Sequence, residues 1–127
     1  SQMAEGLWKA ETDGEWEVYS AGSSPVGYVH PLAIQSMSEA GLDISNCRSK
    51  HLDQFLHESF DVVVTVCDNA AQNCPVFAGA KQTLHWSFPD PAQVKGTHEE
   101  RLAAFRSTRD QIVTRIKTHL FDHFRVF

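Results

Sequence analysis

The sequence predicts a single α/β domain built on a mostly parallel sheet, and two observations carry this prediction. The first is a run of five β-branched residues at positions 62–66, which lies between polar neighbours. A run this short is typical of a strand buried on both faces, as in parallel sheets. The second is that helical patterns precede and follow the run, and helices that alternate with strands indicate βαβ units.

The amino-terminal half is expected to contribute two helices and one strand. Residues 1–11 predict a helix, because their apolar side chains recur in one stripe at helical spacing. Alternating side chains over residues 16–20 predict a strand. A second helix should begin at Pro31, which a first turn accepts, and should end at Gly41, a residue suited to helix termination.

The carboxyl-terminal half adds the central strand, a weaker strand and the longest helix. Residues 50–60 predict a loop and a short third helix, and residues 82–86 predict the weaker strand. Thr97 and Glu100 have the spacing of a capping box, which should open a helix that continues to about residue 123. Only three strands are evident, which is few for a parallel sheet that needs cover on both faces.

Composition limits the class of protein and its partners. The chain has 127 residues, a net charge of −5 and a pI near 5.7. An acidic balance argues against nucleic acid or an anionic membrane as the main partner, and no apolar run reaches the length of a membrane span. Three cysteines do not form a secreted disulfide framework, so we expect a cytoplasmic protein whose thiols serve redox chemistry.

Two of these cysteines follow the central strand. Cys67 stands at its carboxyl end, and Cys74 comes after six intervening residues. Side chains at the carboxyl end of a parallel strand face the crevice where α/β sheets bind ligands. If residues 68–74 were helical, the two Cα atoms would lie roughly 10 Å apart, whereas a disulfide tolerates about 7 Å at most. We therefore hypothesise a redox switch, a dithiol with a helical turn and a disulfide with a looped-out segment.

Two other interpretations of this cysteine pair stay open. Buried cysteines can act as small hydrophobic residues, although the polar residues within 68–73 disfavour that role here. A zinc site would need two further ligands, and neither the cysteine spacing nor the scattered histidines follow a zinc pattern. We accordingly expect His30, His85 and His98 at helix starts or on the surface.

Stretches over nearly the whole chain match a known family. They include Cys74-Pro75, Asp90-Pro91 and residues 1–6, 20–22, 29–34, 41–45, 63–67 and 85–91. In these stretches the chain resembles the thioredoxin-coupled arsenate reductases, which share the fold of the low-molecular-weight protein tyrosine phosphatases. The resemblance implies one three-layer α/β/α domain over residues 1–127, a parallel sheet, and a part in arsenical resistance.

The resemblance also implies a cysteine relay that reduces arsenate to arsenite. In the family a thiolate in a C-x5-R loop attacks arsenate, and the aspartate matched by Asp90 protonates the departing oxygen. Cys67 would attack the cysteine–arsenic adduct, and Cys74 would resolve the mixed disulfide into a Cys67–Cys74 bridge. Thioredoxin would reduce that bridge as the external reductant, so no cofactor is expected.

Three further positions acquire roles only through the resemblance. Ser1 would hydrogen-bond the thiolate of the loop nucleophile. Glu5 and Ser20 match positions that bind a potassium ion in some members of the family. A further acidic ligand of those members is replaced near Lys50, and because an ammonium group disfavours a cation, we do not expect the potassium site here.

The family's first strand and its C-x5-R loop precede the position of Ser1 and have no counterpart within residues 1–127. Cys47-Arg48-Ser49 matches only the end of such a loop. Three explanations compete: the sequence is a piece of a longer protein, a truncated product pairs or swaps strands with a second copy, or residues 124–127 fill the empty strand position. If these residues are the whole protein, we expect neither arsenate reduction nor phosphatase turnover.

Two other functions stay open beside the reductase. A low-molecular-weight protein tyrosine phosphatase would use the same loop and Asp90, and the cysteine pair would be incidental to it. The pair itself, and the lack of a tyrosine after Asp90-Pro91, disfavour this alternative. The third possibility is a non-catalytic binding or assembly module derived from the same fold.

Overall fold

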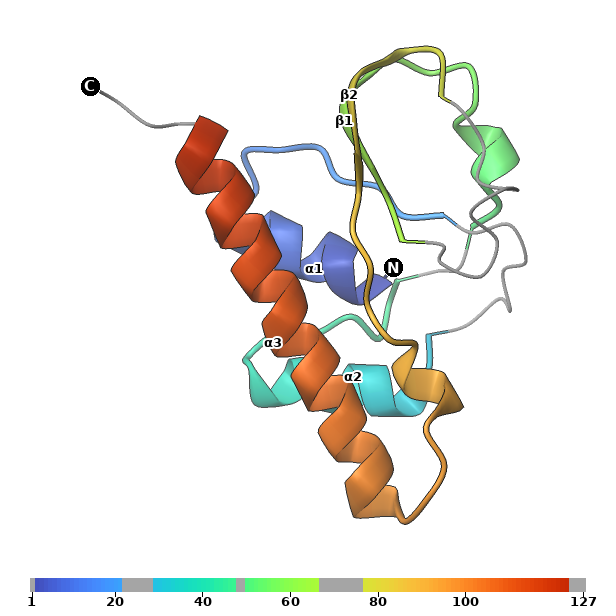
Figure 1. The fold of residues 1–127 in the computed structure, drawn as a ribbon, viewed down its shortest axis with the longest axis vertical. Coiled ribbons are helices and arrows are strands. Elements are labelled where there is room, and N and C mark those ends of the chain that lie inside the picture. The colour runs from blue at the N-terminus through green and yellow to red at the C-terminus, as the bar shows by residue number, and fades with distance from the viewer. Residues whose placement is uncertain (1, 22–28, 48–49, 67–76, 124–127) are drawn as a thin grey trace.

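A computed structural model of the chain describes residues 2–21, 29–47, 50–66 and 77–123. Within these residues lie three α-helices, two strands and two short 3-10 helices. They are, in chain order, α1 (Gln2–Glu11), α2 (Pro31–Glu39), η1 (Leu52–Gln54), β1 (Phe60–Thr65), β2 (Ala80–His85), η3 (Pro91–Gln93) and α3 (His98–His123). Figure 1 shows α3 as a long diagonal helix, with α1 and α2 lying against it and the strands to one side.

The core lies where α1 and α2 pack against α3. Met37, Ile44, Leu102 and Ile116 are each no more than 2% exposed. The other buried apolar residues of the described chain are Met3, Leu7, Trp8, Val29, Leu32, Ala33, Trp86, Phe105 and Ile112. All three predicted long helices are thus confirmed, and each one presents its apolar stripe to this core.

The ends of α2 and α3 follow the signals in the sequence. After α2, Gly41 adopts φ +81°, and the N–H groups of Gly41 and Leu42 donate to the carbonyls of Ser38 and Met37. This is the Schellman arrangement, which places glycine in the left-handed region. At the start of α3, the Glu100 N–H donates to the Thr97 hydroxyl at 3.1 Å, as the capping box predicts.

A close approach between α1 and its neighbours depends on Gly6. A Cβ atom at this position would lie 2.9 Å from the Cγ2 atom of Ile44 and 3.1 Å from the Cε atom of Met37. A larger side chain here would require the Ile44 and Met37 side chains to shift, and both are fully buried. Glycine at position 6 thus lets α1 pack closely against the side chains of Met37 and Ile44.

The sheet of the described residues consists of β1 and β2 in parallel. Val62 pairs with Gln82, and Thr65 pairs with His85 at the carboxyl ends of the strands. The predicted strands at 62–66 and 82–86 are confirmed with a shift of one or two residues. β1 is only half-buried, however, and not buried on both faces. Among the described residues only β2 pairs with it, so its other edge lacks a neighbouring strand.

Two other predicted elements differ from the structure. Residues 16–20 form no strand, because no described segment pairs with them and a strand needs a hydrogen-bonded partner. The predicted helix within 50–60 is reduced to η1 and a turn. The predicted surrogate strand at 124–127 lies outside the described residues.

No helix in the described part of the chain is both long and apolar enough to cross a membrane. The longest, α3, carries charged and polar residues along its exposed side. Arg106 of α3 forms a bidentate pair with Glu39 of α2 at 2.6 and 2.7 Å. Arg109 donates to the Ser36 carbonyl in the last turn of α2, where a helix favours positive charge.

Candidate active site at the carboxyl end of the sheet

The two parallel strands end at the same edge of the sheet. β1 ends at Thr65, two residues before Cys67, and β2 ends at His85, five residues before Asp90. The carboxyl ends of parallel strands lie at the same edge of a sheet. The chain therefore leaves both strands at that edge. The described residues thus show the two strands that precede Cys67 and Asp90 in the chain ending at one edge.

Hydrogen bonds join the two strand ends at this edge. The Thr65 hydroxyl lies 2.8 Å from Nδ1 of His85, and the Trp86 N–H donates to the Thr65 carbonyl at 2.9 Å. Trp86 is buried, and Phe88 packs edge-on against its ring at 6.4 Å. The start of the segment that leads to Asp90 is thus held by backbone pairing and by aromatic packing.

Asp90 is exposed and lies at the end of this segment. It is the N-cap of η3, and its carboxylate accepts a hydrogen bond from the Ala92 N–H at 3.0 Å. The backbone of Pro91 has a fixed φ angle, so the turn that presents Asp90 is stiff. One carboxylate oxygen caps the turn while the side chain stays accessible, which suits a group that donates a proton to a bound substrate.

The other predicted catalytic residues, Ser1, Cys67 and Cys74, lie outside the described residues. Their roles remain predictions, and so does the conformational switch between residues 67 and 74. Among the described residues, no group of three or more histidine, cysteine or acidic side chains could hold a metal ion. The histidines at 30 and 85 have other contacts: His30 caps α2 through the Leu32 N–H, and His85 contacts Thr65.

A second polar cluster surrounds Glu5 in α1. This carboxylate is only 6% exposed, and its Oε1 atom accepts a hydrogen bond from the Ser20 hydroxyl at 3.1 Å. The Nζ atom of Lys50 lies 3.6 Å from Oε1, and that of Lys9 lies 3.6 Å from Oε2. Glu5 and Ser20 do converge, as the resemblance implies, but two ammonium groups already neutralise the carboxylate. These residues do not fit a potassium ion.

Cys47 belongs to the same cluster, a role that the sequence did not reveal. Its Sγ atom lies 3.8 Å from Oε2 of Glu5 in the geometry of a thiol donating to a carboxylate. Burial raises the pKa of the Cys47 thiol, and the negative charge of Glu5 raises it further. Cys47 is thus held as a neutral hydrogen-bond donor, which is the opposite of an activated nucleophile.

This environment predicts slow alkylation of Cys47. In a Cys67→Ser/Cys74→Ser variant, the rate at which iodoacetamide alkylates Cys47, followed on its own peptide by mass spectrometry, should begin to rise at a higher pH than for a free thiol. The sign follows from the raised pKa, because the thiolate is the reactive form. Adding Glu5→Gln removes the negative charge and should move the onset back towards lower pH. Onset at the pH of a free cysteine in both variants would contradict this account.

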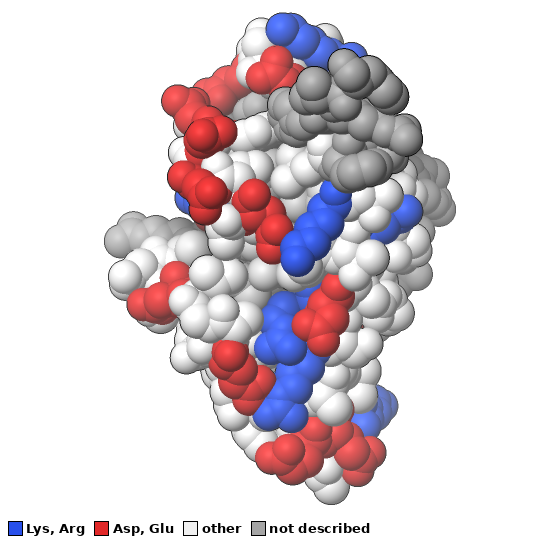
Figure 2. All heavy atoms as spheres, turned by 90° about the vertical axis from the view of Figure 1, so that its left-hand side faces the viewer, with Lys and Arg blue, Asp and Glu red and all other residues white. Residues whose placement is uncertain are grey.

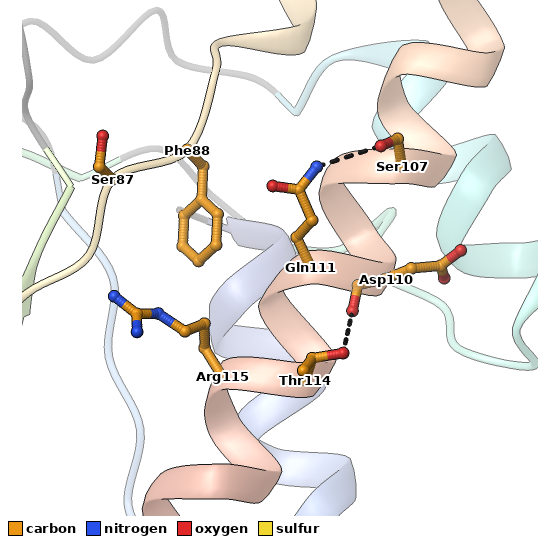
Figure 3. Close-up of a pocket in the computed structure, with 7 residues that line it drawn as sticks. All are labelled: Ser87, Phe88, Ser107, Asp110, Gln111, Thr114 and Arg115. Atoms are coloured by element: carbon orange, nitrogen blue, oxygen red, sulfur yellow. Dashed lines mark hydrogen bonds between the residues drawn. The ribbon is translucent and has the colours of Figure 1, made fainter.

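Two open depressions lie near the segment that carries Asp90. Figure 3 shows the first, of about 610 Å³, between Phe88 and the residues of α3 from Ser107 to Arg115. The guanidinium carbon of Arg115 lies 5.7 Å from the centre of the Trp86 ring beside it. The second, of about 640 Å³, is formed by residues 92–96 and Arg101. Neither includes Asp90, so neither is the candidate active site.

Charged side chains of both signs lie together on one face of the molecule. Figure 2 shows Lys and Arg side chains as a central band on one face, with Asp and Glu side chains on either side. Two arginines of α3 illustrate the pairing, since Arg106 contacts Glu39 and Arg109 contacts Asp110.

Comparison with known proteins extends these observations. Residues 1–124 match the family model of the low molecular weight phosphotyrosine protein phosphatases. An arsenate reductase of Halalkalibacterium halodurans is 49% identical over 118 residues, which cover 93% of this chain and 84% of that protein. An arsenate reductase of Bacillus subtilis is 44% identical over 117 residues, which cover 92% of this chain and 84% of that protein.

Solved structures agree with these relatives. An arsenate reductase in the reduced state superposes with a TM-score of 0.78 at 32% identity, covering 96% of this chain and 88% of that one. An arsenate reductase in the oxidized state gives a TM-score of 0.76 at 32% identity, covering 93% of this chain and 85% of that one. An arsenate reductase in the phosphate binding state gives a TM-score of 0.75 at 30% identity, covering 96% of this chain and 88% of that one. The thioredoxin-dependent arsenate reductase of Corynebacterium glutamicum gives a TM-score of 0.60 at 27% identity, covering 94% of this chain and 55% of that one.

The relatives that match nearly all of this chain are therefore arsenate reductases, and the parallel strands and helices described above have the arrangement of their fold. The chain belongs to the low molecular weight phosphotyrosine protein phosphatase family.

Proposed function

We propose that this protein is an arsenate reductase that converts arsenate to arsenite through a cysteine relay. The observation that carries the proposal is that β1 and β2 run parallel and end two residues before Cys67 and five residues before Asp90. This strand order supports a site in which a thiol and a carboxylic acid act at the same edge of the sheet. The relatives in the reduced, oxidized and phosphate binding states support both a redox cycle and an oxyanion ligand.

The relay accounts for the two electrons that the reduction of arsenic(V) to arsenic(III) consumes. The loop cysteine of the family, which lies before the position of Ser1, forms the covalent adduct with arsenate, and Asp90 donates a proton to the oxygen that leaves as water. Cys67 then attacks the sulfur of the adduct, so that the sulfur–arsenic bond breaks and arsenite departs with the electron pair. Cys74 displaces the loop cysteine, and a Cys67–Cys74 disulfide remains.

Regeneration requires a dithiol reductant, which we propose to be thioredoxin. The thioredoxin dependence of the Corynebacterium glutamicum relative supports this choice. A relay of this kind needs thiols that are kept reduced between turnovers, which fits a cytoplasmic location. Ser1 is proposed to hydrogen-bond the thiolate of the loop cysteine, and the protein needs no resident cofactor.

Thiol titration in the presence of arsenate tests the proposal. The assay uses the product of the complete gene, with its intact mass recorded first, because residues 1–127 contain no C-x5-R sequence. In the absence of reductant, arsenate should remove the thiols of Cys67 and Cys74, and thioredoxin with its reductase should restore both. A tyrosine phosphatase would instead hydrolyse p-nitrophenyl phosphate and keep all thiols free in arsenate. That second result would contradict the reductase assignment.

A further inference from the structure

The cluster around Glu5 joins three segments that are far apart in the sequence. Glu5 lies in α1, Ser20 follows a turn, and Lys50 lies 45 positions after Glu5 in the sequence. Ser20 and Lys50 nevertheless both contact the Oε1 atom of the Glu5 carboxylate. The Glu5 side chain is 6% exposed and that of Lys50 is 30% exposed. A carboxylate this deeply buried destabilises a fold unless positive charge and hydrogen bonds compensate it.

Two ammonium groups share this compensation unequally. Lys9 lies one turn after Glu5 in the same helix, and its side chain is 49% exposed. Such an i, i+4 pair contributes little, because water screens it and the helix alone sets its geometry. Lys50 is less exposed and reaches the carboxylate from a different segment, so its charge is less screened. It also binds that segment to α1.

We propose that Lys50 is the built-in counter-ion of Glu5, and that the fold therefore draws no stability from a monovalent cation at the Glu5–Ser20 position. A cation coordinated by the Glu5 carboxylate and the Ser20 hydroxyl would lie beside the Nζ atom of Lys50, which is itself 3.6 Å from Oε1. Like charges at such a separation repel strongly in a partly buried setting. The proposal concerns stability alone and does not depend on the reductase assignment.

Thermal unfolding of matched variants tests this proposal without an activity assay. Melting temperatures are measured in KCl, NaCl and choline chloride at equal ionic strength for the native protein and for Lys50→Met, Lys50→Arg and Lys9→Met. Methionine keeps the length and apolar contacts of the lysine stem and removes only its charge. Lys50→Met should lower the melting temperature by about 5 °C, whereas Lys9→Met and Lys50→Arg should shift it by about 1 °C at most.

The native protein should melt at the same temperature in all three salts. A saturable rise in KCl that NaCl does not reproduce would overturn the proposal, since it would reveal a potassium ion in the native fold. A loss in Lys50→Met no larger than that in Lys9→Met would overturn it as well. If Lys50→Met does not yield folded protein, the salt series on the native protein and on Lys50→Arg decides the matter.

Discussion

Replacing Cys67 with serine is expected to reduce thioredoxin-dependent release of arsenite to the background rate. A hydroxyl cannot form the disulfide that takes two electrons from the relay, so the arsenic adduct on the loop cysteine would persist. The effect should appear in kcat, because Cys67 acts after arsenate is bound. The measurement is arsenite produced per minute by the product of the complete gene, with thioredoxin and its reductase supplied.

Two further serine variants serve as matched controls for Cys67→Ser. Cys74→Ser should also stop turnover, but it should accumulate a disulfide between Cys67 and the loop cysteine, which non-reducing mass spectrometry detects. Cys47→Ser should retain turnover within about twofold of the native rate, because Cys47 serves as a neutral donor to Glu5. Turnover that survives in Cys67→Ser would exclude the relay.

Replacing Asp90 with asparagine is expected to lower kcat by roughly 10²–10⁴-fold, the usual contribution of a positioned general acid. Asparagine is as good an N-cap as aspartate, so its carbonyl can still accept the Ala92 N–H and η3 should keep its conformation. The loss would therefore report the missing proton and not a disturbed turn. Initial rates of arsenite production measure kcat, and thermal unfolding checks that the fold is intact.

Asp43→Asn is a matched control for this substitution. Asp43 is likewise exposed, and its carboxylate accepts a hydrogen bond from the Ser45 N–H at 2.8 Å. Its pKa is held below the usual range by the hydrogen bonds from Ser45, so it is a turn-capping carboxylate with no proposed part in catalysis. A fall in kcat of the same size in both variants would contradict the role proposed for Asp90.

Local patterns predicted those elements whose stability depends on their own sequence. The capping box at Thr97 and Glu100 and the glycine stop at Gly41 are local hydrogen-bond arrangements, and both occur as the sequence predicts. The strand predicted at 16–20 did not form, because alternation of side chains does not supply a neighbour for the backbone hydrogen bonds. For the same reason the pattern alone overestimated the burial of β1.

The candidate site likewise has one part that the sequence predicts and one part that only the structure reveals. The order of Cys67 after one strand and Asp90 after the next can be seen in the sequence, and the structure confirms that these two strands are parallel. The Glu5 cluster could not be obtained from spacing alone. Ser20, Cys47 and Lys50 are separated from Glu5 by 15 to 45 positions, and only the packing of α1 brings them to its carboxylate. Resemblance to the family anticipated the Ser20 contact and pointed to Lys50, but it gave Cys47 no part.

The most direct test is peptide mapping of the protein after a single exposure to arsenate without reductant. The account predicts one disulfide-linked peptide pair that contains Cys67 and Cys74, and its disappearance once thioredoxin and its reductase are added. Recovery of both residues as free thiols after arsenate has been consumed would contradict the account and leave only the likeness of fold.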